Sequence, residues 1–204
     1  MDQALAVFRN NIDRANDLVS LYDWLGHTVP LLAQYDDLLR SQIVNVVSAF
    51  DKLMHDFIRI GMVEIFEMRR PPTNKYLNEV VAIQHLPGLV GGPACPPSAY
   101  FDAIVREKLS KFSFQQPTKI VDGLSYIWME NHKWQMIARN VGMAEDKMTR
   151  RQQLIVTRRN AIVHEADLDP ITNEKQTITR AEATDISNFL LNLGTQIYNL
   201  VTLR

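Results

Sequence analysis

An arginine, an amide and a histidine lie within six residues in the C-terminal quarter of this 204-residue chain, in the string Arg159-Asn160-Ala161-Ile162-Val163-His164. A guanidinium group offers a planar fork of N–H donors that binds two oxygens of a phosphate. An imidazole ordinarily titrates at about pH 6.5, so it can take up or release a proton near neutrality. These residue types suit a site that holds a phosphate and transfers a proton.

Helical spacing limits how these side chains can act together. Asn160 and His164 are four residues apart and therefore share one face of a helix. Arg159 and His164 are five apart, which separates them by about 140° around an ideal helix. We expect them to converge on one phosphate only if the helix frays at His164 or if a second chain completes the site. Ile162 and Val163 are expected to hold the opposite side in the core.

The segment 147–164 is strongly basic within a nearly neutral chain, whose formal charge is -1. It contains five cations and no acid, which leaves 17 cations against 23 acids elsewhere. One hypothesis is a solvated helix face that pairs with those acids, and the other is a surface that binds phosphates. Arg158 also meets the spacing to His164, but we favour Arg159 for the phosphate because a polar residue follows it directly. If this surface is a phosphate-binding groove, its other cations, called the groove cations below, would be Lys147, Arg150, Arg151 and Arg158.

A few other polar residues are candidates for a supporting role. Asp51 and His55 are four apart, so they form either a polar pair at the edge of the core or a pair that lies near His164. Glu165 and Asp167 either bond to an imidazole or a backbone donor, or belong to the turn after the helix. The single cysteine, Cys95, excludes a disulfide framework and a thiolate zinc site. No metal-ligand spacing and no glycine-rich phosphate loop is present, so we expect no metal and no cofactor.

The apolar spacing predicts helices on both sides of a proline-rich segment. Helices are expected over 2–25 and 31–68, the first ended by Gly26 and Pro30. Further helices are expected over 99–113, with Ser98 as N-cap, and over 117–130. Another helical piece is expected from about 130 to 140, and a longer helix over 144–165. A last helix is expected to begin at a capping box formed by Thr179–Glu182. Residues 71–97 hold six prolines and are expected to be irregular. The prediction is an all-α fold, an irregular bundle of about five to seven helices in a single domain over 1–204. Within it we expect three tryptophans to anchor the core, namely Trp24, Trp128 and Trp134.

Several strings resemble the RiboL-PSP branch of the HEPN superfamily, whose domains are all-α. The Arg159-Asn160-x-x-x-His164 string resembles the superfamily signature of an arginine, a polar residue and a histidine. The segment Ser48–Asp56 with Arg59-Ile60-Gly61-Met62 resembles the long second helix of that branch. Residues 71–76 and the tail from Arg159 to Asp167, followed by one more helix, fit the same branch. The resemblance runs from about residue 35 to 201.

The resemblance implies endonucleolytic cleavage of RNA without a metal, in which the 2′-OH attacks and leaves a 2′,3′-cyclic phosphate and a 5′-OH. It implies that Arg159 stabilises the phosphate, that His164 acts as acid or base, and that Asn160 orients His164 or binds the phosphate. It also implies a homodimer in which two motifs face each other across the interface. The RNA-binding cations would then be the groove cations defined above.

The implied biological role is a toxin or effector of bacterial defence or of a toxin–antitoxin pair, with an antitoxin or defence-complex partner. The alternative is a non-catalytic helical dimer that binds RNA or docks a partner. The apolar runs are too short to span a membrane, and acidic and polar residues follow the first methionine at once. We therefore expect a cytoplasmic protein with no membrane association.

Overall fold

The computed structural model describes residues 1–29, 35–91 and 95–202. Within these ranges the chain forms nine α-helices, one 3₁₀ helix and no strand, so the all-α prediction is confirmed, with more helices than expected. The elements are α1 (Asp2–Thr28), α2 (Asp36–Phe66), α3 (Asn74–Leu77), η1 (Ile83–His85), α4 (Leu86–Gly91), α5 (Pro97–Leu109), α6 (Pro117–Leu124), α7 (Lys133–Val141), α8 (Glu145–His164) and α9 (Arg180–Thr202).

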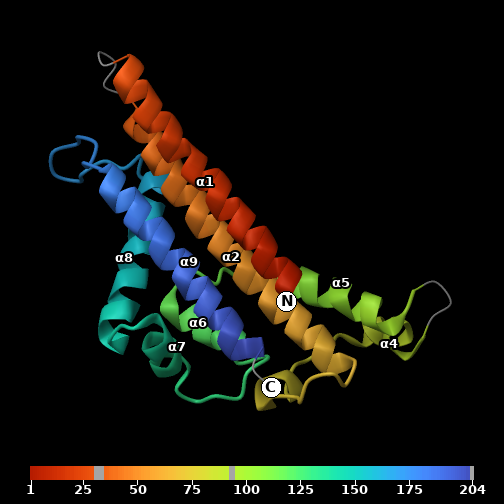
Figure 1. Cartoon of the computed structure of the whole chain (residues 1–204). Coiled ribbons are helices and arrows are strands. Elements are labelled where there is room, and N and C mark those ends of the chain that lie inside the picture. Colours follow the sequence, from red (N-terminus) through yellow and green to blue (C-terminus); the bar gives the residue numbers. More distant parts are fainter. Residues whose placement is uncertain (30–34, 92–94, 203–204) are drawn as a thin grey trace.

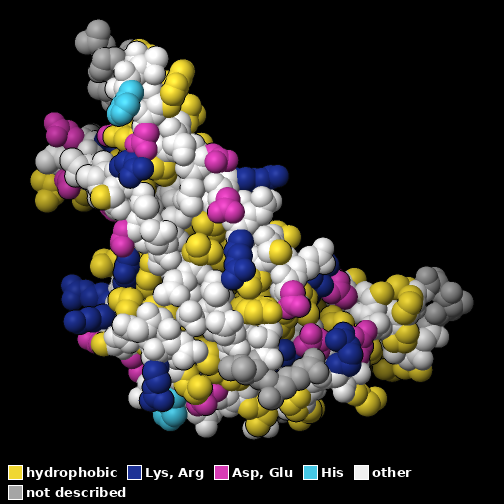
Figure 2. All heavy atoms as spheres, viewed as in Figure 1, with side chains coloured by type: hydrophobic (Ala, Val, Ile, Leu, Met, Phe, Trp, Pro, Cys, Tyr) yellow, Lys and Arg dark blue, Asp and Glu magenta, His cyan; other side chains and the backbone are white. Residues whose placement is uncertain are grey.

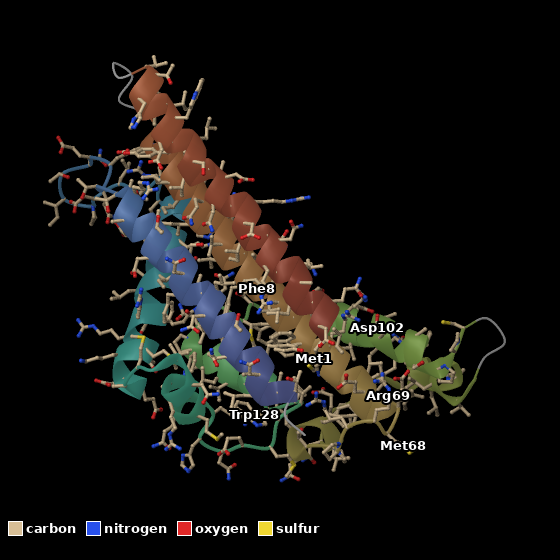
Figure 3. All side chains as sticks on the ribbon, in the orientation of Figure 1. Met1, Phe8, Met68, Arg69, Asp102 and Trp128 are labelled. Atoms are coloured by element: carbon tan, nitrogen blue, oxygen red, sulfur yellow. The ribbon has the colours of Figure 1, made fainter. Side chains whose placement is uncertain are left out.

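Helix α2 is the centre of the bundle. It forms a long antiparallel hairpin with α1, and α9 lies along that hairpin (Figure 1). An apolar stripe of α2 is buried, at Leu39, Ile43, Val46, Phe50, Leu53 and Phe57. Phe8 of α1 meets Phe50 edge to face, with 6.4 Å between the ring centroids, and points into this core (Figure 3). Burying this stripe is the main apolar contribution to the stability of the bundle.

The approach of α9 to this core depends on a glycine. A Cβ atom at Gly194 would lie 2.8 Å from side-chain atoms of both Leu53 and Phe8. The missing side chain therefore lets the backbone of α9 pack directly over the α1–α2 hairpin.

The segment 71–97 is not wholly irregular, because it contains α3, η1 and α4. Thr73 caps α3 by accepting the N–H of Tyr76 at 3.1 Å. Residues 80–101 contain no Asp, Glu, Lys or Arg, and Val80, Ile83 and Val90 are exposed. Apolar side chains accordingly gather at the α4–α5 end of the molecule (Figure 2). This uncharged segment offers no cation to a phosphate.

Several predicted details need correction. Ser98 is not an N-cap, because α5 begins at Pro97, where a proline suits the first turn since it lacks an N–H to satisfy. Trp24 is 61% exposed, because it lies in the last turn of α1 rather than over the core. Trp134 is buried. Trp128, which Figure 3 labels, is half-buried. Pro30 lies outside the described residues.

The boundaries of the last helices follow their local signals. Gly142 ends α7 in the left-handed conformation, at φ 79°, which glycine adopts without strain. Thr179 accepts the N–H of Glu182 at 3.1 Å, which is one of the two bonds of the predicted capping box. In the parts of the chain that the structure describes, no helix is long and apolar enough to cross a membrane.

Candidate functional site

Helix α8 carries the motif and stays helical through His164. The N–H groups of Glu165 and Asp167 both donate to the carbonyl oxygen of Ala161, at 3.0 and 2.9 Å. The last turn is therefore closed and does not fray at His164. Arg159 and His164 keep the angular separation of an ideal helix, about 140°. A single chain consequently leaves these two side chains on different sides of α8.

The guanidinium of Arg159 is not neutralised by any carboxylate of the described residues. Its Nη1 donates to the side-chain oxygen of Asn160 at 3.0 Å. Within residues 1–29, 35–91 and 95–202 it forms no ion pair, and its buried Nε has no hydrogen-bond partner. Asn160 therefore holds Arg159 in this structure rather than His164. A guanidinium that is oriented but not neutralised is suited to an incoming phosphate.

Arg158, by contrast, is bound to the turn that follows α8. It donates to Asp167 Oδ2 at 3.0 Å and to the carbonyl oxygen of Thr177 at 2.9 Å. Arg40 of α2 donates from its Nε to the same Oδ2 of Asp167 at 2.6 Å and from its Nη2 to the carbonyl oxygen of Gln176 at 2.6 Å. Asp167 is fully buried between these two cations. The turn at 165–178 is thus fastened to α2, and Arg158 is occupied by that task.

Arg40 was missing from the candidates that the sequence indicated. It lies in the apolar part of α2, beside Leu39, and is itself buried. A cation among buried positions of a helix is the one local signal that it has a buried partner. The partner, Asp167, is 127 residues further along the chain, and no spacing pattern connects the two.

The remaining predicted cations of α8 differ in their surroundings. Arg151 forms an ion pair with Asp185 of α9 and lies 4.5 Å from the ring centroid of Phe189. Lys147 and Arg150 are exposed and form no ion pair within the described part of the chain. Lys and Arg side chains project from the α8 edge of the molecule (Figure 2). Pairing with acids thus accounts for Arg151 and Arg158, and leaves Lys147 and Arg150 without a carboxylate partner among the described residues.

Asp51 and His55 contact the segment that precedes α6. Asp51 accepts the N–H of Phe114 at 2.7 Å and the side-chain amide of Gln115 at 2.9 Å. The His55 Nε2 lies 3.7 Å from Asp51, and its ring packs edge-on against Phe114. The pair therefore fixes the segment before α6 at the edge of the core, as the first of the two hypotheses for it states.

The residues around His164 differ in part from expectation. Val163 is 44% exposed, so its predicted place in the core is wrong. Ala161 is buried instead, because the turn after α8 folds back on it, and Ile162 is half-buried against the core. Glu165 is exposed and follows the last residue of α8. Among the described residues, no three His, Cys, Asp or Glu side chains gather as a metal ion would require.

Comparison with known proteins decides the family. A sequence model of the RiboL-PSP-HEPN family matches residues 9–202. The chain belongs to the RiboL-PSP-HEPN family. The match extends from α1 to α9, so the motif on α8 of this HEPN domain lies within it. No curated protein and no solved structure matches the chain.

Proposed function

We propose that this HEPN protein is a metal-independent endoribonuclease. The observation that carries the proposal is the state of Arg159, which is oriented by Asn160 and neutralised by no carboxylate of the described residues. It belongs to the same motif as His164, which is exposed at the end of α8. HEPN domains are commonly ribonucleases, which agrees with these residue types.

The proposed reaction needs only RNA, these side chains and solvent water. The 2′ oxygen attacks the adjacent phosphorus and loses its proton, while the bond from phosphorus to the 5′ oxygen breaks and that oxygen gains a proton. The products are a 2′,3′-cyclic phosphate and a 5′-OH. His164 transfers one of these protons, which is worth about 10²–10⁴-fold in rate, and solvent water exchanges the other. Arg159 stabilises the charge that develops on the phosphorane oxygens.

Incubating the purified protein with total RNA and EDTA tests this proposal. We expect cuts whose 5′ ends accept phosphate from a polynucleotide kinase and whose 3′ ends are 2′,3′-cyclic phosphates. Cleavage that stops in EDTA, or that yields 3′-OH and 5′-phosphate ends, would contradict the mechanism.

The divergence of Arg159 and His164 leads us to propose a homodimer in which Arg159 of one protomer meets the partner's His164. Mixing two inactive variants, Arg159→Gln and His164→Ala, is then expected to restore cleavage. Half of the randomly formed dimers are mixed and each has one intact pair, so activity should reach about a quarter of wild type. The measurement is the cleavage rate after co-refolding of the two variants. A mixture as inactive as each variant alone would mean that the pair does not form between protomers.

The biological role that we propose is a toxin or effector whose targets are cellular RNAs and which a partner such as an antitoxin restrains. Expression of wild type is expected to stop growth, and His164→Ala is expected to relieve the arrest.

The separation of Arg159 and His164 around α8 also favours a second candidate function, a non-catalytic helical dimer that binds RNA or docks a partner. Equal growth with both proteins, together with intact RNA in the EDTA assay, would favour this second function.

A further inference from the structure

The long helix α2 exposes a single polar stripe. Only five of its residues are exposed, and they recur every three or four positions. They are Asp37, Ser41, Asn45, Ser48 and Lys52. Residues at this spacing lie on one side of a helix. Since the other sides of α2 pack against neighbouring helices, this stripe is the floor of a surface groove.

A hollow of about 340 Å³ lies over one half of the stripe, between α1 and α2. Two small side chains, Ala15 and Ala49, face it and leave the space open. The rest of its lining is polar or cationic and contains no carboxylate. It consists of Asn11, Arg14, Asn45, Ser48 and Lys52.

The donors of this hollow are largely unused. Within the described residues, the side chains of Asn11, Arg14, Asn45 and Ser48 make no hydrogen bond and no ion pair. Lys52 bonds to Asp56 at 2.6 Å, but its side chain is 56% exposed and can reach a second acceptor. Arg14 comes from α1 and Lys52 from α2, so an anion between them would be held from both walls.

A second hollow, of about 480 Å³, continues the groove and shares Asn45 with the first. Its lining includes Ser41 of α2 and reaches the end of α8 at Ile162. Arg159 is three residues before Ile162, on the same side of α8. Lys175 also lines this hollow and bonds to Asp37 at 2.7 Å, a bond that lowers the pKa of the Asp37 carboxyl.

We propose that this α2 groove, the two hollows that share Asn45, binds the phosphodiester backbone of single-stranded RNA, with Arg14 and Lys52 as its far phosphate contacts. The stripe from Ser41 to Lys52 spans about 16 Å at the helical rise of about 1.5 Å per residue. That length exceeds a single phosphate and suits a short strand. The lining supplies cations, amides and hydroxyls and no aromatic ring, and its one carboxylate, Asp37, is paired with Lys175, so the groove recognises backbone rather than bases. The identity of the ligand rests on the proposed function.

A strand that cannot be cut keeps this test separate from catalysis. A fluorescent 2′-O-methyl oligoribonucleotide lacks the attacking hydroxyl, and its binding to the full chain can be followed by anisotropy across a range of salt concentrations. For Arg14→Gln with Lys52→Gln we expect affinity at 0.1 M salt to fall at least about tenfold. The slope of log K against log salt should become shallower by about 1.4, at about 0.7 per lost contact.

A control of equal charge removes two cations elsewhere. Arg9 is on α1 but about 140° around the helix from Arg14, and Lys119 is exposed on α6; neither forms an ion pair in the described ranges. Arg9→Gln with Lys119→Gln should keep the wild-type slope. Equal slopes for the two double variants would overturn the proposal.

Inorganic phosphate distinguishes a strand from a free ion. One outcome is that millimolar phosphate raises the melting temperature only when Arg14 and Lys52 are present, while their double variant keeps the wild-type slope of log K against log salt for the oligonucleotide. In that case the site takes a free anion, and the RNA proposal is wrong. A wild type that binds the 2′-O-methyl strand through Arg14 and Lys52 yet cuts no RNA would overturn the ribonuclease proposal and leave the groove intact.

Discussion

Replacing His164 by alanine is expected to lower the rate of RNA cleavage by about 10²–10⁴-fold, because it removes the group that transfers a proton in the proposed reaction. The free energy of unfolding of the His164→Ala variant should stay within about 0.5 kcal/mol of wild type. His164 is exposed and makes no hydrogen bond among the described residues, so its loss leaves no cavity and no unpaired group. The measurements are single-turnover cleavage of a labelled RNA in EDTA and the melting temperature.

His132 provides a matched control. It is also exposed, but it precedes α7, at the other end of α8 from the motif. His132→Ala should cleave at the wild-type rate. If His164→Ala cleaves as fast as wild type, or if both variants lose activity equally, His164 does not transfer a proton in the reaction.

The core of α2 shows what periodicity can predict. The apolar spacing predicts a helix over 31–68, and Leu39, Phe50 and Phe57 on its apolar side are buried, because a helix this long has one way to place a continuous apolar stripe. The errors lie where a residue's surroundings come from elsewhere. Trp24 has the side chain of a core anchor, but among the described residues its side chain stays exposed near the end of α1. Val163 fits the apolar pattern of α8, yet the turn after the helix covers Ala161 instead.

The short helices before α5 depend on contacts that a local pattern does not reveal. A Cβ atom at Gly88 of α4 would lie 2.5 Å from the ring of Tyr100 in α5. His85 bonds to the hydroxyl of the same tyrosine at 3.2 Å. Prolines and glycines predict a loop here, and packing against Tyr100 is what turns part of it into helix.

The roles of Arg158 and Arg159 illustrate the same limit at the site. Both meet the spacing to His164, and the residue that follows them was the sole basis for a choice. The structure separates them through Asp167, which accepts from Arg158 as well as from Arg40, whereas Arg159 donates to Asn160. A motif can therefore name the residue types of a site, but distant partners decide which of two neighbours is available to a ligand.

Removing the carboxylate of Asp167 is expected to cost about 3–5 kcal/mol of unfolding free energy, because it leaves Arg158 with no carboxylate partner among the described residues and Arg40 with only the exposed Asp37. Asp167→Asn is the sharper variant. An asparagine keeps the shape of the side chain and tolerates the φ of 60° at this position, so its effect reports the charge. Urea unfolding at pH 7 measures the change for Asp167→Asn and Asp167→Ala.

Asp169 in the same turn serves as the control. Its carboxylate accepts the N–H groups of Ile171 and Thr172 at 2.9 and 3.0 Å, bonds that an asparagine can also accept. The free energy of unfolding of Asp169→Asn should therefore stay within about 0.5 kcal/mol of wild type. If Asp167→Asn is equally mild, Arg40 and Arg158 do not need the charge of Asp167, and the ion-paired turn is not what holds the end of α8. A large loss for Asp167→Asn alone would mean that the turn is held by charge. Arg158 would then be a structural cation, and of the two neighbouring arginines only Arg159 would be without a carboxylate partner among the described residues.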